Sequence, residues 1–195
     1  MARVCRIVVV VEGWEDRAFA EGFLASAGVV PRSIDAKVSP KGHGSGFSFV
    51  REVFAQELGE LARHREGRGV LALMDEDGRG VDSRRGWVAD YLRETERQPI
   101  ACAEGRCLVL PRRNLETWAY WLTGSKIGQN WVVDENEDYK TTRPASATRS
   151  LDNSDWRAVG QHLHTFNHTS PPEGMPEELA SSLVRLREFV NAVRR

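Results

Sequence analysis

Ile7–Val11 is an unbroken run of apolar, mostly valine residues, and the acidic residue Glu12 follows it directly. A run of this kind, bounded by charge, predicts a strand that is covered on both faces, as strands of parallel sheets are. Gly13 then allows a sharp turn into a helix expected over residues 14–27, which places Asp16 about one helical turn from Glu12. Open α/β sheets bind ligands at the carboxyl edge of their strands. The two acids are therefore expected at a ligand-binding corner, unless Asp16 only favours the helix start and Glu12 is solvated.

The rest of the chain alternates apolar runs with amphipathic stretches, which is typical of a parallel sheet connected by helices. Further strands are expected over Ile34–Val38, Val70–Met74 and Cys107–Leu110, and the last could form a hairpin with Ile100–Ala103. Apolar residues at helical spacing predict a final helix over Glu177–Arg194. We therefore predict an α/β fold with a Rossmann-like, mostly parallel four-stranded sheet flanked by helices, and a C-terminal helical extension.

Acidic residues also follow the expected third strand and open the helix after the fourth. Asp75 and Asp77 come directly after the run Val70–Met74, and Glu116 lies in the first turn of a helix that Asn114 can cap. Carboxylate oxygens suit hard divalent cations, and clustered acids would repel one another strongly without one. Taken singly, Asn114 and Glu116 could instead be only a cap and a favourable first-turn charge. The candidate metal ligands are Glu12, Asp16, Asp75, Asp77 and Glu116.

The order of these motifs resembles a known domain. Glu12-Gly-x-x-Asp16 after a first strand and Asp75-x-Asp77 after a later one resemble the toprim domain. Topoisomerases, bacterial primases and overcoming-lysogenization-defect (OLD) nucleases share that domain. The resemblance covers roughly residues 3–124, and Asn114-Leu-Glu116 favours the OLD branch, in which a serine more usually stands at the position of the asparagine. It implies a toprim-like sheet, but it leaves open whether the asparagine is a ligand.

The resemblance implies a divalent-metal-dependent nuclease that hydrolyses DNA or RNA, with two Mg²⁺ or Mn²⁺ ions as cofactors. The five acids would hold the ions, and catalysis would fall to Glu12, Asp75, Asp77, Glu116 and a downstream lysine. Lys140 is the candidate for that lysine, ahead of Lys126 and Arg143. The resemblance also suggests the effector of a prokaryotic defence system in which a separate ATPase takes part. The alternative is a non-catalytic toprim module that binds nucleic acid or recruits a partner.

Residues 1–124 are expected to form the catalytic domain, and residues 125–195 a loop and a helical extension packed on it. The apolar stripe of the last helix is expected to pack on the domain or on a partner. Any exposed part of it would be an association surface, for a homo-oligomer or a complex with the ATPase. No apolar run is long enough for a membrane span and no signal peptide precedes the first strand, so we expect a cytoplasmic protein without membrane contact. A net charge of −1 neither demands nor excludes nucleic acid, and basic pairs such as Arg84-Arg85 and Arg112-Arg113 could touch phosphates.

Three other features carry weaker signals. The glycine-rich stretch that contains Lys41 and His43 lacks the Gly-Lys-Ser/Thr ending of a Walker A loop. It is either a plain connector or a loop that brings these two side chains near the substrate. A three-histidine metal site is conceivable at His162, His164 and His168, but it is disfavoured because neighbours two apart on a helix point apart. Residues 124–151 are polar without sustained periodicity, which predicts a surface loop or one that orders on binding.

Overall fold

The computed structural model describes residues 6–41, 45–63 and 68–195 of the 195-residue chain. Within these residues one sheet is formed by four strands, β1 (Arg6–Val11), β2 (Ile34–Val38), β3 (Arg68–Leu73) and β4 (Arg106–Val109). Their order across the sheet is β2-β1-β3-β4, and each neighbouring pair is parallel. The prediction of an α/β fold with a Rossmann-like four-stranded sheet is confirmed, and its pairings are all parallel.

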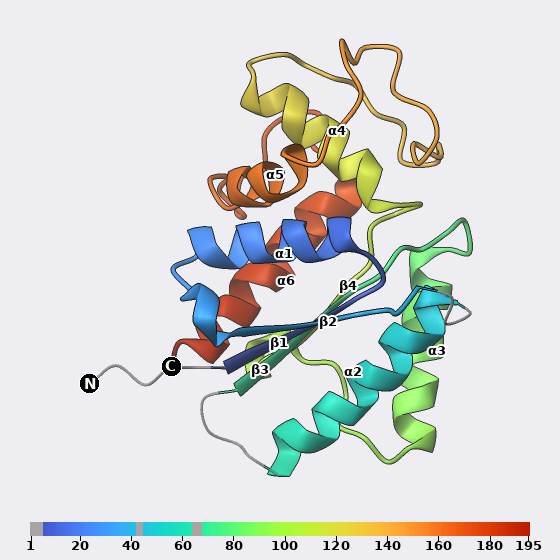
Figure 1. Cartoon of the computed structure of the whole chain (residues 1–195), viewed down its shortest axis with the longest axis vertical. Coiled ribbons are helices and arrows are strands. Elements are labelled where there is room, and N and C mark those ends of the chain that lie inside the picture. Colours follow the sequence, from blue (N-terminus) through green and yellow to red (C-terminus); the bar gives the residue numbers. More distant parts are fainter. Residues whose placement is uncertain (1–5, 42–44, 64–67) are drawn as a thin grey trace.

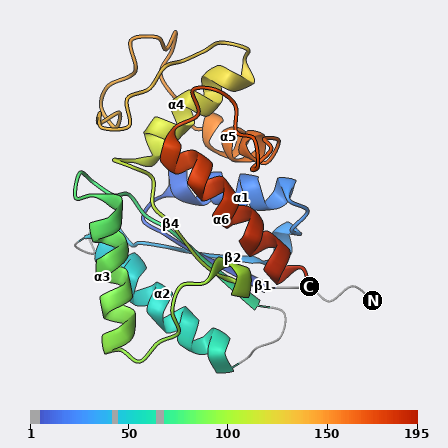
Figure 2. The same cartoon turned by 180° about the vertical axis from the view of Figure 1, so that it is seen from behind.

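Helices cover both faces of this sheet. The first face carries α1 (Trp14–Ser26), α5 (Asp155–Leu163) and α6 (Glu177–Val193), with α4 (Leu115–Lys126) beyond them at the top of Figure 1. The second face carries α2 (Gly46–Arg63) and α3 (Val81–Glu94), as the reverse view in Figure 2 also shows. Two short 3₁₀ helices, η1 (Pro31–Ser33) and η2 (Cys102–Glu104), lie in connections. In the described ranges no helix has the length and apolar character needed to cross a membrane.

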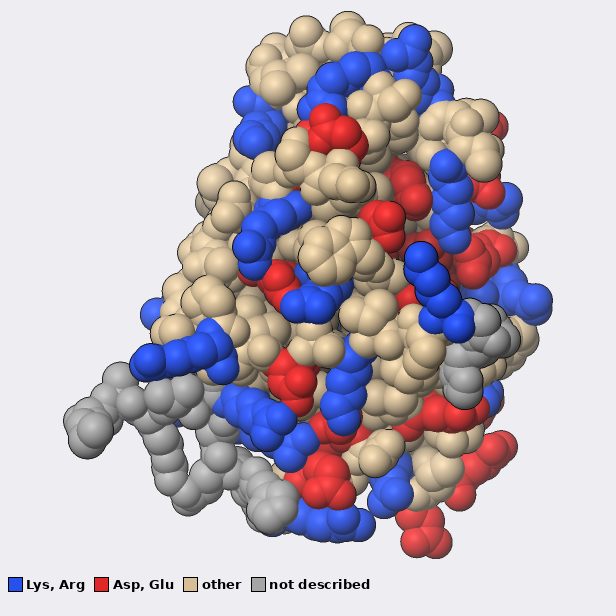
Figure 3. Space-filling model, in the orientation of Figure 1, with Lys and Arg blue, Asp and Glu red and all other residues tan. Residues whose placement is uncertain are grey.

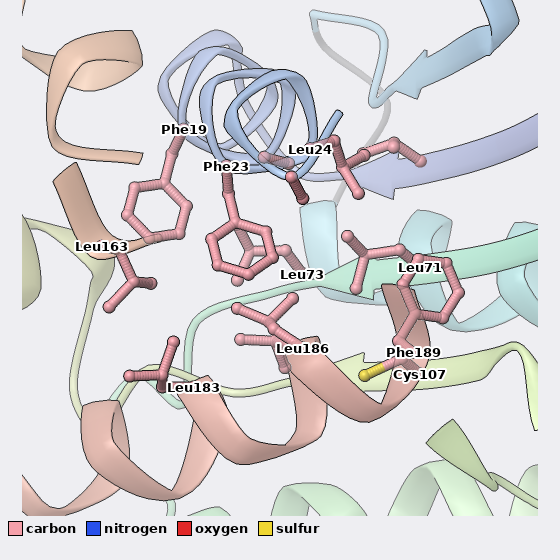
Figure 4. Close-up of a cluster of buried hydrophobic side chains, with 14 of the residues drawn as sticks. Phe19, Phe23, Leu24, Leu71, Leu73, Cys107, Leu163, Leu183, Leu186 and Phe189 are labelled. Atoms are coloured by element: carbon pink, nitrogen blue, oxygen red, sulfur yellow. The ribbon is translucent and has the colours of Figure 1, made fainter. Parts of the chain in front are cut away.

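The strand side chains alternate between two hydrophobic cores, because successive residues of a strand point to opposite faces. In β1, Val9 and Val11 belong to the core under α1 and α6, whereas Val8 and Val10 belong to the core under α2 and α3. All four valines are fully buried. In the first core, phenylalanines of α1 meet leucines of α6 and of β3 (Figure 4). Burial on both faces explains why β1 is apolar without interruption from Ile7 to Val11.

The apolar stripe of α6 faces the sheet. Leu183 and Phe189 are fully buried, and Val193 packs so closely on β3 that a Cβ added at Gly69 would lie 2.3 Å from its Cγ1. The stripe therefore packs on its own domain, the first of the two alternatives from the sequence, and it is not exposed as an association surface. The apolar stripe of α6 therefore does not support a homo-oligomer, which remains a prediction.

α5 packs so closely on α1 that the two backbones touch. A Cβ added at Gly22 would lie 2.2 Å from the carbonyl oxygen of Arg157, and one added at Gly160 would lie 2.1 Å from that of Phe19. Only glycine leaves room for a second backbone at these distances. Through α5 and α6, the stretch expected as an extension contributes to the same core as α1 and α4.

The hairpin expected before β4 is reduced to a single antiparallel bridge between Ala101 and Arg106. Between these residues the chain folds into η2 and turns at Gly105, which has a φ of 76°. A left-handed residue of this kind ends the helical turn and leaves no length for a second strand. β4 therefore lies at the edge of the sheet beside β3 alone.

The strand order brings the ends of β1 and β3 together where the chain reverses its direction across the sheet. α1 leads from β1 to β2 on one side, and α2 leads back past β1 to β3 on the other. Val11 pairs with Leu73, so Glu12 and Asp75 leave the sheet close to one another. Ligands of open α/β sheets bind at such a switch point.

Candidate active site at the carboxyl edge of the sheet

Glu12 and Asp75 are joined directly at the switch point. The backbone N–H of Asp75 donates to Glu12 Oε1 at 3.2 Å, and the N–H of Leu115 donates to Asp75 Oδ1 at 3.0 Å. Asp75 therefore links the end of β1 to the start of α4. Glu116 lies in the first turn of α4, immediately after this link.

Asp16 is buried in the first turn of α1. Its Oδ2 accepts the N–H of Gly13 at 2.8 Å, which closes the N-terminus of the helix. Burial and then the charge of Asp75 raise the pKa of Asp16 well above its ordinary value, and the charges of Glu12 and Glu116 raise it further. Asp16 thus serves the helix start and also lies within electrostatic reach of the other acids.

Burial and like charge make the two glutamates weak acids. Burial, followed by the charges of Asp75 and Asp77, raises the pKa of Glu12 from 4.5 to about 7. Burial, followed by the charge of Asp75, raises the pKa of Glu116 from 4.5 to about 7. Burial also raises the pKa of Asp75, although a nearby lysine opposes the shift. The structure brings all five predicted acids into one group, called here the acid cluster: Glu12, Asp16, Asp75, Asp77 and Glu116.

Lys140 places a positive charge in the acid cluster. Its Nζ lies 2.8 Å from Asp75 Oδ2 and 3.1 Å from Asp77 Oδ1. Burial alone would lower the pKa of Lys140, but the two aspartates outweigh that effect and raise the pKa above its ordinary value. Lys140 is the first of the three cationic candidates from the sequence, and the geometry places it in contact with the acids.

The segment that carries Lys140 is anchored by its own small core. Tyr139, the preceding residue, is buried with Tyr120, Trp131 and Ala147. Asp138 Oδ1 accepts the N–H of Lys140 at 3.0 Å and also the side-chain amide of Asn114 at 2.9 Å. The aromatic residues in this mainly polar stretch are the sequence signal that the segment packs into a core of its own.

Asn114 caps α4, as one reading of the sequence proposed. Its Oδ1 accepts the backbone N–H of Thr117 at 3.3 Å and the hydroxyl of Thr117 at 3.2 Å. Because its side-chain amide binds Asp138, both ends of the asparagine side chain have protein partners. Asn114 therefore braces the segment that carries Lys140, and nothing in these contacts requires it to be a metal ligand.

Glu76 organises the loops that carry Asp77 and Arg113, a role that the sequence analysis did not predict. Its buried carboxylate accepts the backbone N–H of Gly78 at 3.1 Å, of Gly80, and of Arg113 at 3.0 Å. The N–H of Asp77 donates to the carbonyl of Arg113 at 2.9 Å, and both residues have positive φ, 55° and 65°. Such angles are costly for residues other than glycine, so the hydrogen bonds to Glu76 help to hold Asp77 at the site.

We expect Glu76→Gln to lower the free energy of unfolding by about 2 kcal/mol, because the charge-assisted acceptor of three backbone N–H groups becomes a neutral amide. For a chain of this size the melting temperature should fall by about 4–8 °C. Thermal unfolding followed by circular dichroism measures this. Glu52→Gln, an exposed glutamate on α2, is the matched control and should melt within about 2 °C of wild type. Equal melting of the two variants would contradict the role of Glu76.

Arg84 is a second residue whose role the sequence did not reveal. It belongs to one of the basic pairs that could touch phosphates, but its side chain is buried. Its Nη2 lies 3.3 Å from Asp77 Oδ2, and its Nε donates to the carbonyl of Glu76 at 3.1 Å. The guanidinium also lies 4.0 Å from the centroid of the Phe47 ring. Arg84 therefore neutralises and positions Asp77 from behind the site.

The acids do not surround a single point. Within residues 6–41, 45–63 and 68–195, no three His, Cys, Asp or Glu side chains are arranged to hold a metal ion. At the acid cluster the ammonium of Lys140 lies between two of the carboxylates instead. Among the histidines, the ring of His162 packs on Phe166 and that of His164 on Phe23, while His43 lies outside the described residues.

The chemistry of the site is inferred from the geometry of its residues. The chain matches no protein-family model, no curated protein and no solved structure. The resemblance to toprim domains therefore depends on the motifs and their order. The acid cluster is an all-oxygen, anionic group that is open to solvent at Asp77, whose side chain is 41 % exposed. Groups of this kind bind hard cations or cationic side chains.

Proposed function

We propose that this protein is a nuclease that hydrolyses phosphodiester bonds of DNA or RNA with Mg²⁺ or Mn²⁺, and that it is of the toprim/OLD type. The observation that carries the proposal is the meeting of five acids from separate strand ends and helix starts at one edge of the sheet. That edge is where α/β sheets bind their ligands. Burial and mutual repulsion raise the pKa of four of these acids, and a divalent cation would relieve that repulsion.

The donor set fits a divalent ion in chemistry and in charge. Carboxylate oxygens are the ligands that Mg²⁺ and Mn²⁺ prefer, and the cluster already attracts a cation, the ammonium of Lys140. An ion bound by Asp75 and Asp77 would compete with that ammonium, so Lys140 would have to give up at least one of its two contacts. The residues that would hold the ions are Glu12, Asp16, Asp75, Asp77 and Glu116.

A bound ion would lower the pKa of the attacking water and offset negative charge on the phosphate. The other steps fall to the chain itself. Lys140, once released by the aspartates, is placed to steady the negative charge that develops on the phosphate. Arg113 lies at the same edge, 3.7 Å from Asp138, and can hold an adjacent phosphate. Without an ion, the pKa of about 7 leaves Glu12 and Glu116 partly protonated at neutral pH, and a bound ion would favour the ionised carboxylates that ligate it.

One observation favours a second function. Lys140 already neutralises part of the acid cluster by ion pairs with Asp75 and Asp77. On that basis the edge would be a non-catalytic module that binds nucleic acid or recruits a partner, and the acids would be ion-paired structural groups. The two functions differ in one respect, since only the nuclease turns substrate over when an ion is added.

The test is a cutting assay of the purified protein on plasmid DNA, single-stranded oligonucleotides and structured RNA. We expect cutting of at least one of these with Mg²⁺ or Mn²⁺ and none in excess chelator. Cutting that persists in chelator would contradict the dependence on metal. If wild type leaves every substrate intact with both ions, the non-catalytic module becomes the better account.

The biological setting is also part of the proposal. An effector role in prokaryotic defence, a separate ATPase partner and action in the cytoplasm rest on the resemblance to OLD nucleases. Residues 1–124 would then supply the catalytic domain, and the segment after α4 would supply Lys140. Light scattering, alone and with a candidate ATPase, is the direct measurement of assembly.

A further inference from the structure

Two of the six tryptophans are exposed, and both lie near the acid cluster. Trp14 is 55 % exposed and Trp87 is 43 % exposed, whereas the other four are buried. Trp14 follows Glu12 by two residues, at the first position of α1. An exposed indole is a large, rigid, apolar surface that a ligand can cover at little cost in side-chain entropy.

Trp87 is connected to the acid cluster by short contacts. Its ring lies edge-on to that of Phe47, with centroids 6.0 Å apart. The residue before Phe47 lies against the cluster, because a Cβ added at Gly46 would be 2.5 Å from Glu12 Oε2. One aromatic ring therefore separates Trp87 from the backbone that touches Glu12.

Guanidinium groups accompany both exposed rings. Arg17 lies 5.4 Å from the ring centroid of Trp14, and Arg79 lies 5.4 Å from that of Trp87. An arginine beside an aromatic ring provides a positive charge next to a flat apolar surface. Nucleotides carry the complementary pair, a flat base and a negative phosphate.

We propose that the substrate is a single-stranded stretch of nucleic acid whose unpaired bases stack on Trp14 and Trp87, with the phosphates between them over the acid cluster. This inference rests on the proposed function and names its substrate class. Every base has a flat face, so stacking binds single strands with little dependence on sequence. In a duplex the bases stack on one another and cannot reach an exposed indole without being flipped out.

The charges on one face of the protein agree with binding of a single strand. On the face in Figure 3, lysine and arginine side chains are interspersed with acidic ones and do not form one broad basic area. Affinity for duplex DNA comes mainly from many phosphate contacts, which an interspersed surface supplies poorly. Stacking on an exposed indole adds affinity that does not depend on the number of phosphate contacts.

The test is binding of fluorescently labelled 12-mers by anisotropy, with Ca²⁺ in place of Mg²⁺ so that binding is measured apart from cutting. We expect single-stranded DNA or RNA to bind at least tenfold more tightly than a duplex of the same sequence. Trp14→Ala and Trp87→Ala should each weaken single-strand binding about tenfold, or about 1.4 kcal/mol. Trp14→Phe and Trp87→Phe keep an aromatic face and should retain most of the affinity. The DNA and RNA arms identify the preferred sugar.

Ile127→Ala is the matched control, since Ile127 is 48 % exposed just after α4 and lies outside the acid cluster. It should bind as wild type does, and melting curves check that every variant is folded. Duplex binding as tight as single-strand binding, or alanine variants that bind as wild type, would overturn the proposal even if the protein cuts nucleic acid with metal. Conversely, tryptophan-dependent binding without any cutting would support stacking and contradict the nuclease.

Discussion

Asp75→Asn is expected to abolish metal-dependent cutting, with a fall in rate of about a thousandfold or more. Asparagine keeps the shape of the side chain, and its oxygen can still accept the N–H of Leu115, so the link between β3 and α4 should persist. The change removes the charge that contacts Lys140 and that acts on Glu12, Asp16 and Glu116. A loss of about 4 kcal/mol of transition-state stabilisation corresponds to about a thousandfold in rate.

Initial rates of cutting with Mg²⁺ and with Mn²⁺ measure this effect. Asp82→Asn is the matched control, because the Asp82 side chain is fully exposed at the start of α3 and takes no part in the acid cluster. It should cut at the wild-type rate. If Asp75→Asn also cuts at the wild-type rate, the acid cluster is not the catalytic centre.

Glu12→Gln is expected to raise the melting temperature in chelator by about 4–8 °C at pH 8. Glutamine can still accept the N–H of Asp75, while the repulsion from Asp75 and Asp77 is lost. We expect the free energy of unfolding to rise by about 2 kcal/mol. This is less than the full pKa shift of Glu12 implies, because the side chain is partly exposed and solvent screens its charge. Asp77→Asn is a poorer test, since it also breaks the ion pairs with Lys140 and Arg84.

The stabilising effect should depend on pH with a definite sign. The pKa of Glu12 is about 7 in the folded protein and 4.5 in an unperturbed glutamate, so the folded state retains a proton that the unfolded chain has released. The protonated carboxyl thus contributes stability that is fully present below pH 4.5 and is lost as the pH rises through about 7. In chelator, wild type should lose stability from pH 5 to pH 8, and Glu12→Gln should lose less.

Metal should reverse the order of the two proteins. An ion that binds only the folded state adds about 2.7 kcal/mol at a hundredfold excess over its Kd, and the variant lacks one ligand charge. At pH 8, wild type should therefore gain more from Mn²⁺ than Glu12→Gln does. Glu52→Gln should follow wild type throughout. If Glu12→Gln melts at the same temperature as wild type, both in chelator and with Mn²⁺, Glu12 is an independent, solvated acid.

The sheet could be predicted from sequence because its signal is local. The run Ile7–Val11 is apolar at every position, which has one simple explanation, burial on both faces. The acids at strand ends were predictable for a related reason, since parallel strands end at one edge. The packing of α5 on α1 was not predictable, because nothing local shows that Gly22 faces a backbone 135 residues later in the chain, at Arg157.

Within the site, the sequence revealed the acids better than the residues that hold them. Glu76 stands between two candidate ligands and looks like a third, yet its carboxylate accepts the backbone N–H groups of two loops. Arg84 looks like a surface charge and is buried against Asp77. Only the family resemblance pointed to Lys140. The residues alone could not, because the contacts of Lys140 with Asp75 and Asp77 depend on how the segment after α4 folds back.

The central claim is that the acid cluster holds divalent ions. The most direct measurement is the anomalous difference map of a crystal soaked in Mn²⁺, which locates manganese without reference to activity. The account predicts at least one manganese peak between Asp75 and Asp77, with Lys140 withdrawn from one or both of them and Glu12 or Glu116 among the ligands. A map without manganese at the cluster, with Lys140 still bound to both aspartates at millimolar Mn²⁺, would contradict it.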